Sequence, residues 1–358
     1  MQPPAETNGT TLTGATASPR AASSGAPLAV EVTARCNRAC LYCYNSWRTE
    51  PPSTEAELNA DEMVPLVNQA LEATGRRVVQ LSGGEPLLRA DLFEFIERLR
   101  APGRTISLVT DGGLVDDDVA SRLRKLGVGP VQPTLLAARR EVHDRIKGIP
   151  SFDATVSAIS RLQRAGIPVA VSFVSTRLNH GHFRDVVELC FALGVTTVAY
   201  SRFCNAGAGS GPALELTPSP DMVAEDLDVA SWARSNLGIR VNIAISLPLC
   251  LPGPRHQRFL KFGRCALATR SPGYTIDPWG RLRACSVSPI ILGDLRSEPF
   301  EVIQERARSG YFREVAELPS ECLGCGQAAA CGGGCRESAR SAFGALDRAD
   351  PLARPAAN

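Results

Sequence analysis

Residues 28–43 read LAVEVTARCNRACLYC, a short apolar run followed by three closely spaced cysteines. The run 28–33 is rich in apolar and β-branched residues, which predicts a buried strand. The cysteines Cys36, Cys40 and Cys43 then fall in the loop that leaves this strand. In parallel β/α folds, sites are built from the loops at this end of the strands. The stretch therefore predicts a first strand with a site at its carboxyl end.

The pattern that begins at Leu28 repeats as far as about residue 245, with short β-rich runs alternating with amphipathic helical stretches. This order predicts six or seven β-α units around a parallel sheet. We expect an α/β fold, a partial (β/α)6 TIM-like barrel rather than a closed eightfold one. The expected strands are 28–33, 78–81, 105–110, 131–135, 169–174, 197–200 and, more weakly, 238–243. The expected helices are 61–73, 91–99, 116–126, 152–165, 183–193 and 221–236.

The composition changes after Pro248, where Pro, Gly and Cys become frequent and helical periodicity is confined to about 300–315. A small region with few large apolar residues usually needs a bound metal or another cross-link to be stable. We therefore expect a barrel at 28–247 and a C-terminal cysteine-rich domain at 248–358. Residues 1–27 are rich in Ala, Thr, Ser, Gly and Pro, which predicts a disordered tail.

Bulk properties exclude several classes of protein. A net charge of +2 gives no strong field for nucleic acid or an acidic membrane surface, and no apolar run is long enough to span a bilayer. The amino-terminal stretch lacks a basic start and a continuous apolar segment, so it is no secretory signal, and we expect a cytoplasmic protein. Twelve cysteines in that compartment favour metal binding over disulfides.

Cys36, Cys40 and Cys43 suit an iron–sulfur cluster with one open iron. Three thiolates within eight residues can hold three irons of a cubane, whereas an electron-transfer cluster is closed by four cysteines. Tetrahedral zinc would need a fourth Cys or His nearby, and 31–65 contains none beyond these three. Zinc or a ferredoxin-type role remains the alternative.

The segment Cys36-Asn-Arg-Ala-Cys40-Leu-Tyr42-Cys43 resembles the signature of the radical SAM superfamily. The resemblance implies a [4Fe-4S] cluster whose open iron binds S-adenosylmethionine (SAM). It also implies reductive cleavage of SAM to a 5′-deoxyadenosyl radical, which abstracts a substrate hydrogen. Tyr42 would then pack near the adenine.

Further segments resemble the SAM-binding elements of this family and fall at the ends of the expected strands. Gly83-Gly84-Glu85-Pro86 follows the second strand, where two glycines would let backbone approach the methionine moiety and Glu85 would accept from its ammonium. Thr110-Asp111-Gly112 ends the third and resembles the ribose-contacting Thr-Asn-Gly. Ser172, Asn179 and Arg202 resemble contacts to the SAM carboxylate and ribose. A capping Ser, a loop Asn and a surface Arg are the alternative interpretations of these three.

One segment departs from the family pattern. The family usually shows Ser-Leu-Asp at the end of the fourth strand, whereas Thr134-Leu135-Leu136 lacks the carboxylate. His143 and Asp144, a little further on, are expected to be structural residues at a helix start.

The C-terminal cysteines form a second pattern. Two cysteines are separated by fourteen residues, Gly280 and four more residues, and a CxxCx5CxxxC motif follows. This composite resembles the SPASM extension of radical SAM enzymes, which carries two auxiliary Fe-S clusters. A zinc ribbon would leave the Gly280 spacing unexplained. The cysteines of the pattern are Cys265, Cys285, Cys322, Cys325, Cys331 and Cys335.

The resemblance implies an interleaved set of cluster ligands. Cys265, Cys285 and Cys335 would bind the first auxiliary cluster, and Cys322, Cys325 and Cys331 the second. Each then needs one more ligand.

Cys250 lies where many family members place an additional cysteine, which would complete the first cluster. The last cysteine of the family is absent, since the chain has Ala353 there, leaving Asp347, Asp350, water or substrate for the second. Cys190 and Cys204 are expected to be buried small apolar residues. One or two auxiliary clusters are therefore expected.

The resemblance implies an oxidoreductase that most often modifies a ribosomally synthesised peptide. Only about 27 residues precede the first strand, too few for a winged-helix leader-binding domain, so a separate recognition protein would be expected. A reducing partner such as flavodoxin or ferredoxin is also implied. Oxidation of a small molecule and a non-catalytic Fe-S or zinc scaffold remain the alternatives; sulfatase maturation is weaker, because Ser286 stands where those enzymes have an Asp base.

Overall fold

The computed structural model describes residues 26–48, 55–252, 254–269 and 271–354, so the expected tail lies almost wholly outside the described residues. All seven expected strands form, in the expected order and mostly within two residues of the expected bounds. They are β1 (Leu28–Glu31), β2 (Val78–Ser82), β3 (Thr105–Thr110), β4 (Val131–Pro133), β5 (Val171–Ser175), β6 (Thr197–Arg202) and β7 (Arg240–Ile243).

The strands form a partial barrel of two parallel sheets. β1 to β4 pair consecutively in one sheet, and β5 to β7 form the other. Within the described residues, the two sheets are joined only by isolated bridges, between Val131 and Val169 and between Thr134 and Ser172. The carboxyl ends of the strands therefore still point to one common side.

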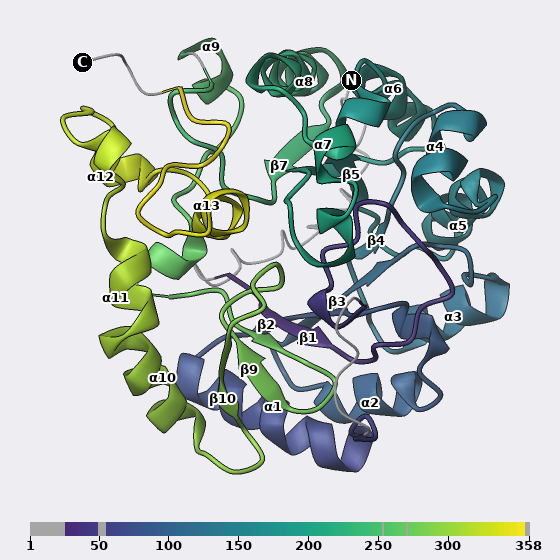
Figure 1. Ribbon diagram of the computed structural model, residues 1–358. Coiled ribbons are helices and arrows are strands. Elements are labelled where there is room, and N and C mark those ends of the chain that lie inside the picture. Colours follow the sequence, from purple (N-terminus) through teal and green to yellow (C-terminus); the bar gives the residue numbers. More distant parts are fainter. Residues whose placement is uncertain (1–25, 49–54, 253, 270, 355–358) are drawn as a thin grey trace, which may run out of the picture.

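Helices cover the outer face of the strands (Figure 1). The six expected helices form, and the structure adds α4, α7 and α9, which the sequence did not predict. Capping explains α1, because the side chain of Asn59 accepts from Glu62 N–H at 3.1 Å and the Glu62 carboxylate accepts from Asn59 N–H at 2.9 Å. The helices of this part are α1 (Ala60–Thr74), α2 (Leu92–Leu99), α3 (Asp117–Lys125), α4 (Arg140–Lys147), α5 (Phe152–Arg164), α6 (Phe183–Ala192), α7 (Ala213–Leu216), α8 (Pro220–Trp232), which runs into a π-helical turn (Ala233–Leu237), and α9 (Pro254–Gln257).

The C-terminal part adds a hairpin to the barrel sheet. β8 (Thr275–Ile276) pairs in parallel with β1, and β9 (Arg281–Arg283) and β10 (Ile291–Asp294) follow it antiparallel. The division at 247 stays a prediction, and the two parts share this seven-stranded sheet.

The expected helix at 300–315 is divided at Gly310, whose backbone (φ −106°, ψ −102°) leaves the helical region. The C-terminal helices are α10 (Phe300–Ser309), α11 (Tyr311–Ala316), α12 (Ala328–Cys331) and α13 (Arg336–Phe343), and they lie at the left of Figure 1.

A buried ion pair joins the C-terminal hairpin to the first strand. Glu31 on β1 and Arg283 on β9 are both almost fully buried and bonded to each other, and Trp47 Nε1 donates to the same carboxylate at 3.1 Å. The hairpin is thus fixed to β1 by side chains as well as by strand pairing.

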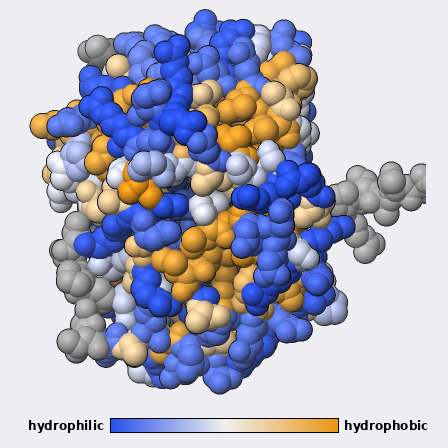
Figure 2. Space-filling view, turned by 90° about the vertical axis from the view of Figure 1, so that its right-hand side faces the viewer, coloured by the Kyte–Doolittle hydropathy of each residue, from blue (hydrophilic) through white to orange (hydrophobic). Residues whose placement is uncertain are grey.

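The surface carries both hydrophobic and hydrophilic areas. Seen from the side of α3, α4 and α5, hydrophobic areas alternate with hydrophilic ones (Figure 2). Among the described helices, none has the length and apolar character needed to cross a membrane.

Candidate functional site

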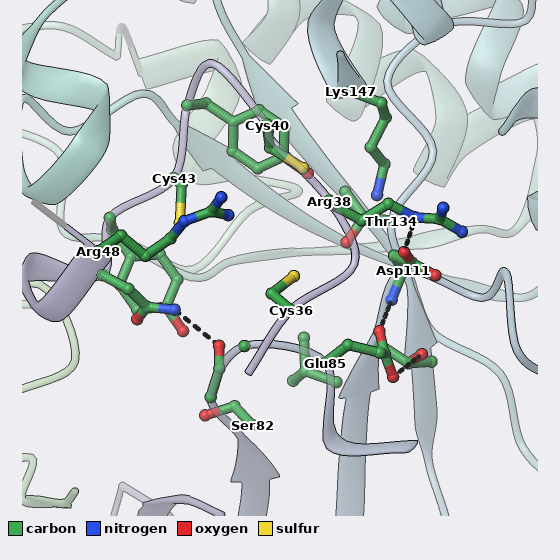
Figure 3. A pocket seen from close by; sticks show the side chains of 17 residues that line it. Cys36, Arg38, Cys40, Cys43, Arg48, Ser82, Glu85, Asp111, Thr134 and Lys147 are labelled. Carbon is green, nitrogen blue, oxygen red and sulfur yellow. Dashed lines mark hydrogen bonds and ion pairs between the residues drawn. The ribbon is translucent and has the colours of Figure 1, made fainter. Parts of the chain in front are cut away.

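The loops after β1, β2 and β3 meet around one cavity at the carboxyl ends of the strands. The cavity encloses about 630 Å³ of empty space, part of it open to solvent. The three cysteines lie on one loop at its wall (Figure 3). Of the predicted site residues, the structure brings to this cavity Cys36, Cys40, Tyr42, Cys43, Gly83, Gly84, Glu85, Thr110 and Asp111.

Ser172, Asn179 and Arg202 are not among the residues that line this cavity. Asn179 is buried, and its amide is occupied by backbone: it accepts from Thr176 N–H at 2.7 Å and donates to Leu136 O at 2.9 Å. Arg202 is buried in an ion pair with Asp350. SAM contacts at these three positions stay a prediction.

Gly83 and Gly84 hold the end of β2 against the cysteine loop. Gly84 N–H donates to Thr33 O at 2.8 Å, and Glu85 N–H donates to Arg35 O at 2.9 Å. A Cβ at Gly84 would overlap Arg35 O, and Gly83 has a φ of 130°. We expected the absence of side chains at these glycines to let a ligand approach. In the structure it lets the backbone before Cys36 pack closely against them.

Glu85 connects β2 to β3. Its carboxylate accepts from Thr110 Oγ1 at 2.8 Å, from Asp111 N–H at 2.8 Å and from Leu87 N–H at 3.1 Å. Burial raises the pKa of Glu85 to about 7, and the nearby Asp111 carboxylate adds to the shift. Asp111 itself forms an ion pair with Arg38. Both carboxylates are thus already bonded within the protein.

Two lining residues that the sequence analysis did not identify carry polar atoms without partners. Asn45 donates to Gly83 O at 2.7 Å, but its buried Oδ1 has no hydrogen-bond partner. Lys147, at the end of α4, is 1% exposed, and within the described residues its amino group makes no hydrogen bond or ion pair. Figure 3 shows it extending toward Arg38 and Thr134. A buried amino group of this kind calls for an anionic or polar ligand.

A contact between the cysteine loop and α4 explains the position of Lys147. Leu41 N–H donates to Ile146 O at 3.0 Å, which brings the helix end beside Cys40. The only sequence signal was a lysine before the capping Gly148, and that position ordinarily places a charge in solvent at a helix end.

The residues present fit a cluster and SAM. Cys36, Cys40 and Cys43 are all partly exposed at the cavity, and burial raises the pKa of Cys36 to about 11. A metal would stabilise the thiolate that burial disfavours. No three His, Cys, Asp or Glu side chains in the described part are grouped to hold a single metal ion. The unpartnered atoms of Asn45 and Lys147 face the same space, where a polar ligand would satisfy them.

Comparison with known proteins agrees with this geometry. Residues 30–190 match the Radical SAM superfamily. The AdoMet-dependent heme synthase of Methanosarcina barkeri is 26% identical over 343 residues, which are 88% of this chain and 93% of the relative. The mycofactocin maturase MftC of Mycobacterium tuberculosis is 29% identical over 328 residues, 90% of this chain and 81% of the relative. This chain is a radical SAM enzyme.

The radical SAM enzyme also has the fold of a solved structure, anSMEcpe with bound AdoMet and the Cp18Cys peptide. The TM-score is 0.69 at 18% identity, with 92% of each chain covered, so this likeness supports the fold alone. The expected fold class is confirmed, as are the [4Fe-4S] cluster and SAM as cofactors.

When bound at this site, a cluster and SAM would supply this radical SAM enzyme with one-electron chemistry that can remove a hydrogen atom from a substrate. The residues of the chain position these groups. Gly84 and Glu85 fix the cysteine loop to β2, and the Arg38–Asp111 pair fixes it to β3. Lys147 and Asn45 offer a donor and an acceptor toward the ligand.

His143 and Asp144 are structural, as expected. His143 is fully buried: its Nδ1 accepts from Leu136 N–H at 3.2 Å, and its Nε2 lies 3.2 Å from Ser151 Oγ. Burial, with the charge of Lys147, lowers the pKa of His143 to about 4. Asp144 Oδ1 accepts from the backbone N–H groups of Ser151 and Phe152 and so caps α5.

The C-terminal cysteines gather in two groups. Cys265 and Cys285 lie near Cys335, and Cys325 and Cys331 lie near Cys322. This grouping agrees with the sets implied by the sequence pattern. Two further cysteines differ from expectation: Cys250 lies with the second group instead of the first, and Cys204 contacts the first group. The ligand assignments themselves stay predictions.

Proposed function

We propose that this radical SAM enzyme modifies a ribosomally synthesised peptide. The observation that carries the proposal is the shape of the site. A single drug-sized ligand typically occupies about 300–1,000 Å³. The cavity, with about 630 Å³ of empty space that is partly open to solvent, falls in this range, so a cluster and SAM would leave little enclosed space beside them. A peptide needs to insert only its reacting side chain into such a site.

The relatives support the same substrate class. Several matched relatives are named maturases, and the matched solved structures include anSMEcpe with a bound peptide and SuiB of Streptococcus suis with its precursor peptide SuiA. A separate leader-recognition protein and a reducing partner would complete the system.

A second candidate is the oxidation of a small molecule. It is favoured by the heme synthase relatives, which match along 88–95% of this chain. A tetrapyrrole would need more enclosed space than a side chain does, and this is why we place it second.

The experiment separates the two by the nature of the activating substrate. The enzyme is reconstituted anaerobically with iron, sulfide, SAM and dithionite, and release of 5′-deoxyadenosine is measured with extract of the source organism. We expect stimulation that disappears when the extract is first digested with a protease and then ultrafiltered. Stimulation that survives digestion would assign a small-molecule substrate instead. The Cys36→Ala/Cys40→Ala/Cys43→Ala variant is the control for extract enzymes.

A further inference from the structure

We propose that the C-terminal part holds two auxiliary iron–sulfur clusters that are each closed by four cysteines, with Cys204 and Cys250 as the ligands that the motif lacks. The inference goes beyond the proposed function, because it concerns the cluster ligands and holds for either substrate class. The first set is Cys204, Cys265, Cys285 and Cys335. The second set is Cys250, Cys322, Cys325 and Cys331.

Cys204 belongs to the first set because its sulfur lies among the others. It follows β6 by two residues and is 6% exposed. The side chains of Cys204 and Cys265 both lie beside that of Cys335. Cys285 interacts with both Cys265 and Cys335. The buried cysteines Cys204 and Cys265 and the partly exposed Cys285 thus lie around Cys335, a grouping that an apolar core does not require.

The surroundings of Cys204 are polar, which an apolar role does not explain. Its sulfur lies 3.1 Å from Ser338 Oγ and accepts from Arg202 Nη1 at 3.5 Å. A guanidinium and a hydroxyl beside a buried sulfur stabilise a thiolate. By contrast, Cys190 is fully buried within the hydrophobic core on α6.

Cys250 belongs to the second set for reasons of position. It interacts with Cys325 and Cys331, and Cys322 interacts with all three of these cysteines. The preceding residue, Leu249, donates its N–H to Cys331 Sγ at 3.3 Å. The chain around Cys250 therefore runs directly against the cysteine motif, although Cys250 and Cys331 are 81 residues apart in sequence.

Cys250 also stands where the missing cysteine would be. Its Sγ accepts from Arg354 N–H at 3.1 Å, so it lies against the backbone that follows Ala353. The sulfur of Cys250, which belongs to another segment, therefore lies close to Ala353, where the family pattern has its last cysteine. This explains in physical terms how the chain can lack the last cysteine of the pattern and still close the cluster.

Asp350, one of the two carboxylates that the sequence left as candidate ligands, is already bonded. Its Oδ2 accepts from Cys335 N–H at 2.9 Å and from Arg202, and its Oδ1 accepts from Leu352 N–H at 2.9 Å. Moving it to an iron would leave the buried Arg202 unpaired, at a cost of several kcal/mol.

Closure by four thiolates has a chemical consequence. A cluster with four cysteine ligands has no open iron, in contrast to the one held by Cys36, Cys40 and Cys43. Substrate would then bind to neither auxiliary cluster directly. The N–H groups of Leu249 and Arg354 that point to sulfurs are of the kind that tunes cluster potentials.

The test uses the full chain with Cys36, Cys40 and Cys43 replaced by Ala, so that only the auxiliary clusters remain. Iron, sulfide and the EPR spectrum of the oxidised protein are measured after anaerobic reconstitution. This parent should hold about eight iron atoms in EPR-silent oxidised clusters. Adding Cys204→Ala or Cys250→Ala should lower the iron by one to four atoms or produce a [3Fe-4S] signal.

Cys190→Ala is the matched control and should leave iron and EPR unchanged. Unchanged iron and spectra in Cys204→Ala or Cys250→Ala would overturn the assignment for that cysteine. Cys204→Ser and circular dichroism separate ligand loss from misfolding, since the hydroxyl keeps the size of the buried group. Cys250 can also be tested without a substitution at this position, because iodoacetamide should alkylate its thiol in the apo-protein and not in the reconstituted protein. Equal alkylation in both states would refute its role.

Discussion

Gly84→Ala tests the contact that fixes the cysteine loop. The added Cβ would overlap Arg35 O, and the two backbone hydrogen bonds that join Gly84 to Thr33 and Glu85 to Arg35 would have to lengthen. Overpacking costs about 1–3 kcal/mol, and each hydrogen bond contributes about 0.5–1.5 kcal/mol. The loop should therefore leave β2 at a cost of about 2–6 kcal/mol, which lowers the population of the closed loop by roughly 30-fold to 20,000-fold.

The assay is the EPR spectrum of the reduced enzyme with and without SAM. Only the open iron binds SAM, so a SAM-dependent change reports the cluster at Cys36, Cys40 and Cys43. We expect the change to be lost in Gly84→Ala while the auxiliary signals remain.

Gly211→Ala is the control for Gly84→Ala. Gly211 has a φ of −58°, and an added Cβ would be 3.8 Å from Ala208 O. A wild-type response to SAM in Gly84→Ala would refute the view that these glycines admit the cysteine loop.

Three further predictions follow from buried charges. Lys147→Met should weaken SAM binding by roughly 10- to 100-fold in equilibrium dialysis, because a hydrogen bond to a charged group contributes about 1.5–3 kcal/mol. An unchanged affinity for SAM would exclude Lys147 from the SAM site. Arg283→Met should lower the free energy of unfolding by about 3–5 kcal/mol in anaerobic urea titrations, since it leaves Glu31 buried and unpaired, and adding Glu31→Gln should recover most of this. Burial raises the pKa of Asp226 from 3.8 to about 6, so the folded state favours the protonated carboxyl. The stability that this protonated group contributes is fully present below pH 3.8 and is lost as the pH rises through 6. Relative to wild type, Asp226→Asn should therefore gain about 1.4 kcal/mol of unfolding free energy between about pH 5 and about pH 7.5, and a constant difference would contradict the shifted pKa.

Local sequence signals predicted the fold and the residues after β1, β2 and β3 that meet at the first cavity. The strands are short and apolar, and the cysteines, the Gly83-Gly84 pair and Thr110 follow strands directly, so strand order alone brought them together. The division of the C-terminal helix at Gly310 was less visible, because the apolar spacing continues through it.

What the sequence could not predict depends on contacts between distant segments. Cys204 and Cys335 are 131 residues apart, and no spacing rule joins them. Lys147 resembles an ordinary basic residue in a last helical turn until the loop before Cys43 is seen to pack against that helix end. In both cases the side chain acquires its surroundings from packing and not from its neighbours in sequence.

The pairing of β8 with β1 has a consequence for how the chain folds. Among the described strands β1 is synthesised first, but its second partner lies near residue 275, so one side of β1 stays unpaired until most of the chain has been made. Such long-range pairing slows folding, and an exposed strand edge promotes aggregation. A chain truncated before β8 should accordingly accumulate as aggregate, even though the cysteine loop and all strands up to β7 would be present in it.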